Sequence, residues 1–111
     1  VDQLRQAPER AIARAQALRE AGYPGDALAE LGETARRLRG VPGAGALEQT
    51  ADAWRGDGAF ARALKGEAKL EATRKRAERT RDADKARALW EKLREEYGDT
   101  CLKPRIEEAL R

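Results

Sequence analysis

Residues 84–100 read DKARALWEKLREEYGDT, and this stretch decides the fold class. Five apolar residues recur in it at the spacing of helical turns: Ala86, Leu89, Trp90, Leu93 and Tyr97. Residues spaced by three, four and seven lie on one side of an α-helix, and the positions between them are mostly charged. The stretch therefore predicts an amphipathic helix whose apolar side packs against neighbouring helices.

The composition of the whole chain extends this expectation to the fold. The 111 residues are 41% hydrophobic, 39% charged and only 5% aromatic, with two valines and two isoleucines. Alanine and leucine supply most of the apolar mass, which suits close helix packing, whereas β-sheets need β-branched and aromatic residues. A chain of this length has room for one domain and one core. We expect a single all-α domain over residues 1–111, cut from a longer chain.

Glycine, proline and capping residues divide the chain into about six helices. Pro8 starts the first helix, which ends before Gly22, and Asp26 caps the second, which ends at Arg39. The next helices are expected over residues 46–55, 59–80 and 102–110, with the quoted stretch, capped by Asp82 or Asp84, between the last two. Short connections predict antiparallel neighbours, stacked as helical hairpins in a right-handed superhelix or a compact bundle. The turn-forming GVPGAG, residues 40–45, is a possible sub-boundary.

One side of each predicted helix supplies the core. The residues expected to face inward include Leu4, Ala11, Ile12, Ala15, Leu18, Ala27, Leu28, Leu31, Ala35, Leu38, Leu47, Ala51, Trp54, Phe60, Ala63, Leu64, Ala68, Leu70, Trp90, Leu93, Leu102, Ile106, Ala109 and Leu110. Both tryptophans are expected in the core, and Trp90→Ala is expected to cost about 3–5 kcal/mol. Residues 71–81 offer only Ala72 and Ala77 as apolar groups, so this half of the fourth helix should project or be covered on a narrow strip.

A family resemblance follows from the quoted stretch. Ala86, Trp90, Leu93 and Tyr97, followed by a Gly98 turn and a new amphipathic helix, resemble the second helix of a tetratricopeptide-like repeat. The resemblance is clearest over residues 84–110. It recurs more weakly over residues 8–39, where a glycine turn precedes Ala27 and Leu31. The two alanines at the helix contacts, Ala27 and Ala86, stand 59 residues apart, which does not fit a regular array of units of about 34 residues.

The resemblance implies a binding function without chemistry. It implies a helical protein-interaction or scaffold domain, or a module that braces a larger bacterial chain. The implied partner is another protein or a neighbouring domain of the same longer chain.

The residues themselves offer little for catalysis. The chain has no histidine and one cysteine, so the commonest general base and the usual zinc ligands are missing. Adjacent acids such as Glu95 and Glu96 diverge around a helix, and acids at helical spacing are flanked by basic residues. We therefore expect no enzyme activity and no catalytic, metal or cofactor site. Cys101 is either a reactive thiol near a helix N-terminus or a small residue that fills a turn, and Asp99 favours the second interpretation.

A basic segment is the sequence's candidate interaction surface. Residues 74–81 read RKRAERTR and carry five basic side chains against one acid: Arg74, Lys75, Arg76, Arg79 and Arg81. With Lys69 they form the alternative hypothesis, a nucleic-acid-binding helical domain. Glu71, which is spaced to pair with Lys75, and the lack of interleaved aromatic residues favour a solvated helix face.

The charge balance and the hydropathy indicate in which surroundings the chain can fold. The 23 basic and 20 acidic side chains give a net charge of +3, which describes a mixed-charge, soluble surface. No apolar run is long enough for a transmembrane helix, and no signal sequence is recognisable, so we expect no membrane partner. The sequence leaves the compartment open between the cytoplasm and, if a signal has been removed, the periplasm. It predicts no oligomeric state.

Overall fold

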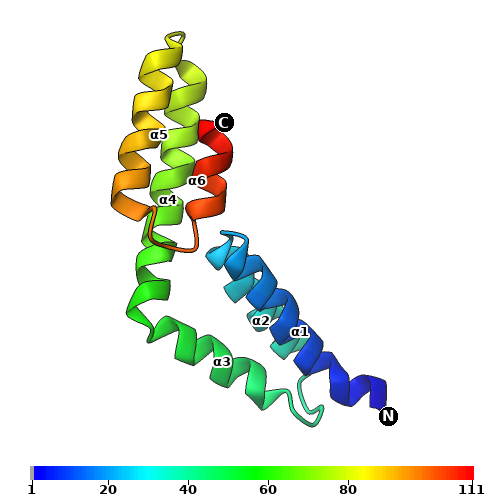
Figure 1. Ribbon diagram of the computed structural model, residues 1–111. Coiled ribbons are helices and arrows are strands. Elements are labelled where there is room, and N and C mark those ends of the chain that lie inside the picture. The colour runs from blue at the N-terminus through cyan, green and yellow to red at the C-terminus, as the bar shows by residue number, and fades with distance from the viewer. Residues whose placement is uncertain (1) are drawn as a thin grey trace.

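A computed structural model describes residues 2–111, with side chains from residue 7 onward. The described chain forms six α-helices and no strand: α1 Asp2–Glu20, α2 Pro24–Arg37, α3 Gly45–Arg55, α4 Gly58–Arg79, α5 Ala83–Tyr97 and α6 Lys103–Leu110. Consecutive helices run antiparallel within α1–α3 and within α4–α6, and the chain bends between α3 and α4 (Figure 1). The all-α prediction of six helices is confirmed.

The first helix begins earlier than predicted. α1 starts at Asp2, so Pro8 lies inside the helix and not in its first turn. Proline has a φ angle that suits a helix, but inside a helix it lacks an N–H donor and its ring crowds the carbonyl four residues earlier. The buried ring of Pro8 faces the loop after α2, 3.6 Å from where a Cβ on Gly43 would stand. The side chain of Leu4 lies outside the described residues, so its packing stays a prediction.

The second helix is displaced by two residues at both ends. Pro24 opens α2, and Asp26 lies in the first turn, so the prediction that Asp26 caps the helix is wrong. The N-cap is Tyr23, which makes no side-chain capping bond. Proline at the first helical position loses no intrahelical bond, and this lets the helix start without a polar cap. α2 ends at Arg37, shortly before the backbone turns through Gly40 with φ +85°.

The bounds of α3, α4 and α6 agree with the predicted ranges within one residue at each end. Asp82 is the cap of α5, since its carboxylate accepts hydrogen bonds from the backbone N–H groups of Asp84 and Lys85 at 2.9 and 3.3 Å. The structure thus selects Asp82 over Asp84. α6 begins at Lys103, after a turn that contains Cys101.

The helices form two units of three, α1–α3 and α4–α6, and α4 also contacts α2 and α3 of the first unit (Figure 1). In the N-terminal unit, α1 packs on α2 and both contact α3. In the C-terminal unit, α5 packs on α4, and α6 packs on α5. The molecule measures 57 × 24 × 18 Å with a radius of gyration of 16.9 Å. A compact chain of this length would have a radius of about 13 Å, so the molecule is elongated.

The buried hydrophobic side chains among residues 7–111 form two clusters, where one core was expected. The first contains Ala11, Ala15, Ala27, Leu31, Leu47, Ala51, Trp54 and Phe60. The second contains Leu70, Leu93, Tyr97, Leu102 and Ile106. α4 has 22 residues and is about 33 Å long, so it reaches both clusters. The two clusters divide within α4 and not at residues 40–45, because Leu31 and Leu47, which flank that loop, belong to the same cluster.

Some residues expected in the core lie elsewhere. Ala68 and Ala109 are exposed, whereas Gly66, which the prediction passed over, is buried. Alanine suits a helix surface as well as a core, so helical spacing alone could not decide its burial. Trp54 is 9% exposed and belongs to the first cluster. Trp90 is half-buried and packs against the edge of the second cluster.

The end of α4 projects, which is the first of the two alternatives that the sequence left open. Among residues 71–81 no side chain is buried, and the paired ends of α4 and α5 extend beyond α6 (Figure 1). None of the described helices combines the length and the apolar character needed to span a bilayer.

Candidate functional site

The predicted basic segment lies at the projecting end of α4. Arg74, Lys75, Arg76, Arg79 and Arg81 are all exposed. Within the described part of the chain, the last four have no carboxylate partner, in contrast to Arg74. The structure thus places the predicted residues on one protruding element, but it does not bring them around a cavity of their own.

Arg74 is held by its own helix. Its guanidinium contacts the carboxylates of Glu71 and Glu78 at 3.1 and 2.7 Å. The hydrogen bond to Glu71, followed by that to Glu78, raises the pKa of Arg74. The expected pairing of Glu71 with Lys75 is absent among the described side chains, because Glu71 pairs with Arg74 and with Arg105 of α6 instead. Arg74 is therefore the least available of the five predicted residues.

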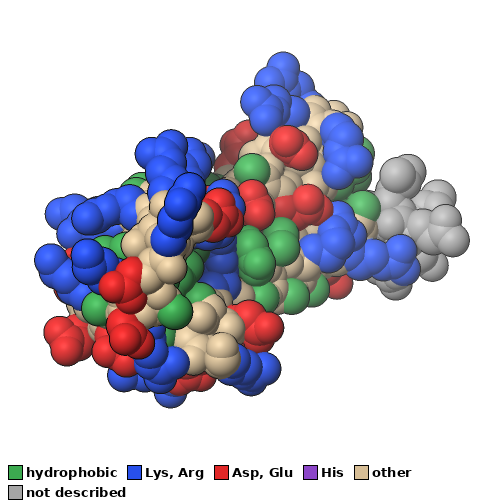
Figure 2. Space-filling model, turned by 90° about the horizontal axis from the view of Figure 1, so that it is seen from above, with side chains coloured by type: hydrophobic (Ala, Val, Ile, Leu, Met, Phe, Trp, Pro, Cys, Tyr) green, Lys and Arg blue, Asp and Glu red, His purple; other side chains and the backbone are tan. Residues whose placement is uncertain are grey.

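The surrounding hairpin is strongly basic. Residues 74–87, here called the basic hairpin, carry seven basic and three acidic side chains, a net charge of +4 against +3 for the whole chain. Figure 2 shows lysine and arginine side chains around the end of this hairpin. A hollow of about 340 Å³ between α4 and α5 is lined by Lys69, Arg76 and Lys92. Glu96 lines it too, and its hydrogen bond to Lys69 raises the pKa of that lysine.

Cys101 has the surroundings of a structural residue. It lies in the turn before α6, is partly buried, and lines a hollow with Arg19 and Arg62. Burial raises the pKa of the thiol, and the nearby charge of Arg19 offsets this only in part. Because the thiolate is the nucleophile, a raised pKa argues against a reactive cysteine.

The acids at helical spacing on α4 form an ion-pair site. Glu67 and Glu71 are four residues apart, and the guanidinium of Arg105 lies between them at 2.8 and 2.9 Å. The side chain of Arg105 is only 15% exposed. The guanidinium occupies the position that a shared proton or a metal ion would need. Across the described residues, no group of three His, Cys, Asp or Glu side chains could hold a metal ion.

Arg105 also joins the two units, and the sequence analysis missed it. Its Nη1 donates to the backbone carbonyl of Gly22, 3.0 Å away, in the turn between α1 and α2. Its guanidinium carbon lies 4.2 Å from the centre of the Tyr23 ring. Glu67 completes the link, because Oε1 accepts a hydrogen bond from the backbone N–H of Gly25 at 3.1 Å. These five residues are called the junction. Contacts between residues so far apart in the sequence produce no periodic pattern of residue types, so the sequence alone could not indicate them.

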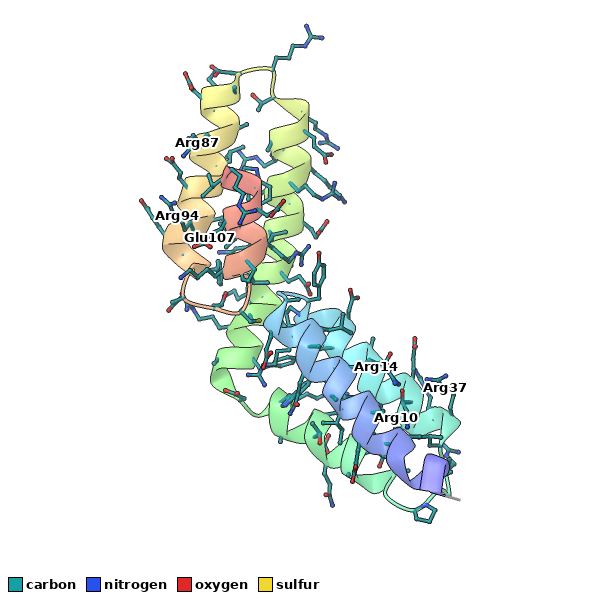
Figure 3. All side chains as sticks on the ribbon, turned by 45° about the vertical axis from the view of Figure 1, so that its right-hand side comes forward. Arg10, Arg14, Arg37, Arg87, Arg94 and Glu107 are labelled. Carbon is teal, nitrogen blue, oxygen red and sulfur yellow. The ribbon has the colours of Figure 1, made fainter. Side chains whose placement is uncertain are left out.

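A second arginine cluster lies on the N-terminal unit. Figure 3 shows Arg10, Arg14 and Arg37 together along α1 and α2. Arg14 contacts Glu30 at 2.9 Å, and Arg37 donates to the buried hydroxyl of Thr34 at 3.2 Å. Arg14 is paired with a carboxylate and Arg37 is held by a neutral hydroxyl, so both side chains are already engaged within the chain.

A groove lies between α2 and α3. It encloses about 650 Å³ and is lined by Gly25, Leu28, Ala29, Leu31, Gly32, Ala35, Arg36, Leu47, Glu48, Ala51, Asp52 and Arg55. The floor is apolar and the charged residues stand at the rim. The described lining residues come from α2 and α3 alone, so the groove occupies a face that α1 leaves uncovered.

The rim of this α2–α3 groove has one compensated pair and two separate charges. Asp52 and Arg55 on α3 contact each other at 3.0 Å. Arg36 on α2 and Glu48 on α3 are exposed, and neither forms an ion pair with any described residue. Arg36 is in the last turn of α2 and Glu48 in the first turn of α3. Because the two helices run antiparallel (Figure 1), these two positions lie toward the same end of the groove, one on each helix.

Gly32 lies in the middle of the α2 wall. A Cβ added there would meet no described atom within 4 Å, and its φ is not positive. Glycine inside a helix costs about 1 kcal/mol relative to alanine. Nothing in the described chain requires glycine at this position. An unexplained glycine in the predicted second helix was the sequence signal that could have indicated the groove.

Comparisons with protein-family models, with curated proteins and with solved structures found no match. The resemblance to tetratricopeptide-like repeats therefore stays a prediction.

Proposed function

We propose that this chain is a non-enzymatic helical interaction or scaffold domain. It docks a partner protein, or a neighbouring domain of the same longer chain, in the α2–α3 groove. The observation that carries this proposal is the groove itself, an apolar floor between charged lips on a face that α1 does not cover. Concave apolar surfaces with a few polar groups are the usual sites of specific binding.

The placement of the reactive side chains supports a role without catalysis. Glu67 and Glu71 are both paired with Arg105, Glu71 is also paired with Arg74, and the Cys101 thiol has a raised pKa. Catalytic acids and bases need free access to a substrate and a pKa near the working pH. The two glutamates instead link α4 to α6 through Arg105, and Glu67 also accepts a hydrogen bond from the backbone N–H of Gly25.

The groove can be tested with a variant that fills it. A displayed library of random peptides of about 16 residues, roughly four helical turns, is selected against the whole chain. Selected peptides are then titrated against the parent, Gly32→Leu and Gly45→Leu by fluorescence anisotropy. Gly45→Leu is the matched control, since Gly45 also has open space around it but does not line the groove.

We expect Gly32→Leu to weaken binding about tenfold or more, equivalent to 1.4 kcal/mol, and Gly45→Leu to leave it unchanged. A library that yields no binders, or binders that do not distinguish Gly32→Leu from the parent, would overturn the proposal.

A second candidate function is nucleic-acid binding by the basic hairpin. It is favoured by the four exposed cations that lack carboxylate partners: Lys75, Arg76, Arg79 and Arg81. Each phosphate contact releases counterions, so binding would weaken steeply with salt. Titration of duplex DNA at several salt concentrations tests it, with Arg79→Gln/Arg81→Gln as the variant. Absence of binding at low salt excludes this alternative.

A further inference from the structure

We infer that the α2–α3 groove selects an amphipathic α-helix with a small residue opposite Gly32 and with an acid and a base on opposite flanks. This inference rests on the proposed function and names the kind of partner. It follows from the shape of the groove, from the bare backbone at Gly32 and from the two separate charges on the lips.

The shape and chemistry of the groove favour a helix over an extended peptide. The lining of α2 runs from Gly25 to Arg36, and eleven residue steps in a helix span about 16 Å, or three turns. The floor offers leucine and alanine side chains, and helix backbones have already used their N–H and C=O groups. An extended peptide would bury backbone groups without partners there. A helix satisfies its own backbone and presents only side chains to the floor.

Gly32 sets the distance of approach. Its position has no Cβ and its surroundings are open, so the axis of a docked helix can lie closer to α2 there than at a leucine. The closest packing requires a small residue, such as alanine or glycine, on the docked helix. Larger apolar residues one turn away on each side can contact Leu28 and Ala35, which also line the groove.

The lip charges set the orientation. Arg36 on the α2 lip favours an acid, and Glu48 on the α3 lip favours a base. Residues two apart on a helix lie about 200° apart around its axis, so one acid and one base at this spacing reach both lips. Gly32 is one turn from Arg36, so the small residue of the docked helix lies about one turn from this charged pair. The Asp52–Arg55 pair at the other end is already compensated and adds no preference.

The peptides selected through the groove provide the test. Their helicity in the bound state is followed by circular dichroism, and their charges are compared with the expected pattern. Affinities are measured for the parent, for Arg36→Glu, for Glu48→Lys and for the double variant. Asp26→Lys is the control, because Asp26 is exposed on α2 but does not line the groove.

We expect each single reversal to weaken binding about tenfold, since like charges then face each other across the lip. A peptide with its acid and base exchanged should bind the double variant more tightly than it binds the parent. Asp26→Lys should have little effect. Two results would overturn this inference while leaving the docking function intact. In the first, peptides whose affinity falls in Gly32→Leu bind in an extended form. In the second, their affinity is unchanged by both charge reversals. Loss of all groove-dependent binding would remove both.

Discussion

The two units of this protein each contain a glycine in a helix interior, and the two glycines stand in opposite surroundings. In the C-terminal unit, a Cβ on Gly66 of α4 would lie 2.6 Å from Cδ1 of Tyr97 and 2.8 Å from Cδ1 of Leu102. In the N-terminal unit, a Cβ on Gly32 of α2 would meet no described atom within 4 Å. The first glycine is required by the packing of its own chain, and the second is not.

This difference shows which helix surface is filled by side chains of the same chain and which is left with open space. α4 accepts the Tyr97 ring at Gly66, so α4 and α5 are in close contact at this point. At Gly32 the corresponding space is part of the α2–α3 groove. The open surface of the C-terminal unit is instead the basic hairpin. The two units therefore offer different surfaces, one apolar and concave, the other charged and protruding.

The two tryptophans should give the largest difference between the units. Trp54 is nearly buried, its ring lies 5.4 Å from that of Phe60, and Arg19 lies over it. Trp54→Ala should lower the free energy of unfolding by about 3–5 kcal/mol. Trp90 is half-buried, so Trp90→Ala should cost about half as much as Trp54→Ala, below the value expected from sequence alone. Urea unfolding followed by circular dichroism measures both, and equal losses would contradict the difference in burial.

Breaking the junction should uncouple the units. Arg105→Met removes the partner of the part-buried Glu67 and the bond to the carbonyl of Gly22, and should cost about 1–3 kcal/mol. Trp54 and Trp90 lie in different clusters, so the ¹⁹F NMR signals of 5-fluorotryptophan at both positions report on each unit within one intact protein.

We expect the two urea midpoints to coincide in the parent and to separate in Arg105→Met. Arg111→Met is the control, since its contact with Glu108 is highly exposed. Coincident midpoints in Arg105→Met would show that the shared helix α4, and not the junction, couples the units.

Alanine at the two glycines should change stability in opposite directions. Gly32→Ala should raise the free energy of unfolding by about 1 kcal/mol, because it removes the helix cost of glycine and meets nothing. Gly66→Ala gains the same helix propensity but must displace Tyr97 or Leu102, which costs about 1–3 kcal/mol, so it should be neutral or destabilising. Thermal unfolding of both variants checks this, and a stabilising Gly66→Ala would show that its neighbours yield easily.

The smallest effect should be a loss of stability in acid. The hydrogen bond from Arg74, more than the contact with Arg105, lowers the pKa of Glu71 below its ordinary value of 4.5. Arg62 lowers the pKa of Asp99, and the Ala59 N–H, followed by Arg19, lowers that of Asp57, both from 3.8. A carboxylate with a lowered pKa stabilises the fold above its unfolded-state value, and this contribution disappears as pH falls through the folded value.

Stability should thus hold from pH 7 to about 5 and decline below 4.5, less steeply in high salt. Urea unfolding across this range measures the decline, and Glu71→Gln should show a shallower one. Stability that rises toward pH 3 would contradict these ion pairs.

Local sequence patterns predicted most of the helices and part of the core. The stretch around Trp90 became α5, and residues 71–81 project because they carry too little apolar surface to be buried. The patterns misplaced Ala68 and Ala109, since alanine is equally suited to core and surface. They also left Arg105 and Gly32 unnoticed, because the partners of one and the open space around the other depend on distant helices.

The sequence by itself determined that this protein is a set of amphipathic helices with a mixed-charge surface and a basic end on α4. Hydrophobic spacing, breakers and caps act within a few residues, so they can be read from the chain directly. Only the tertiary structure decided that there are two clusters and not one, that Arg105 joins them, and that α2 and α3 leave a groove between them. Those features depend on contacts between residues as far apart as Gly22 and Arg105, whose positions are set by how whole helices pack.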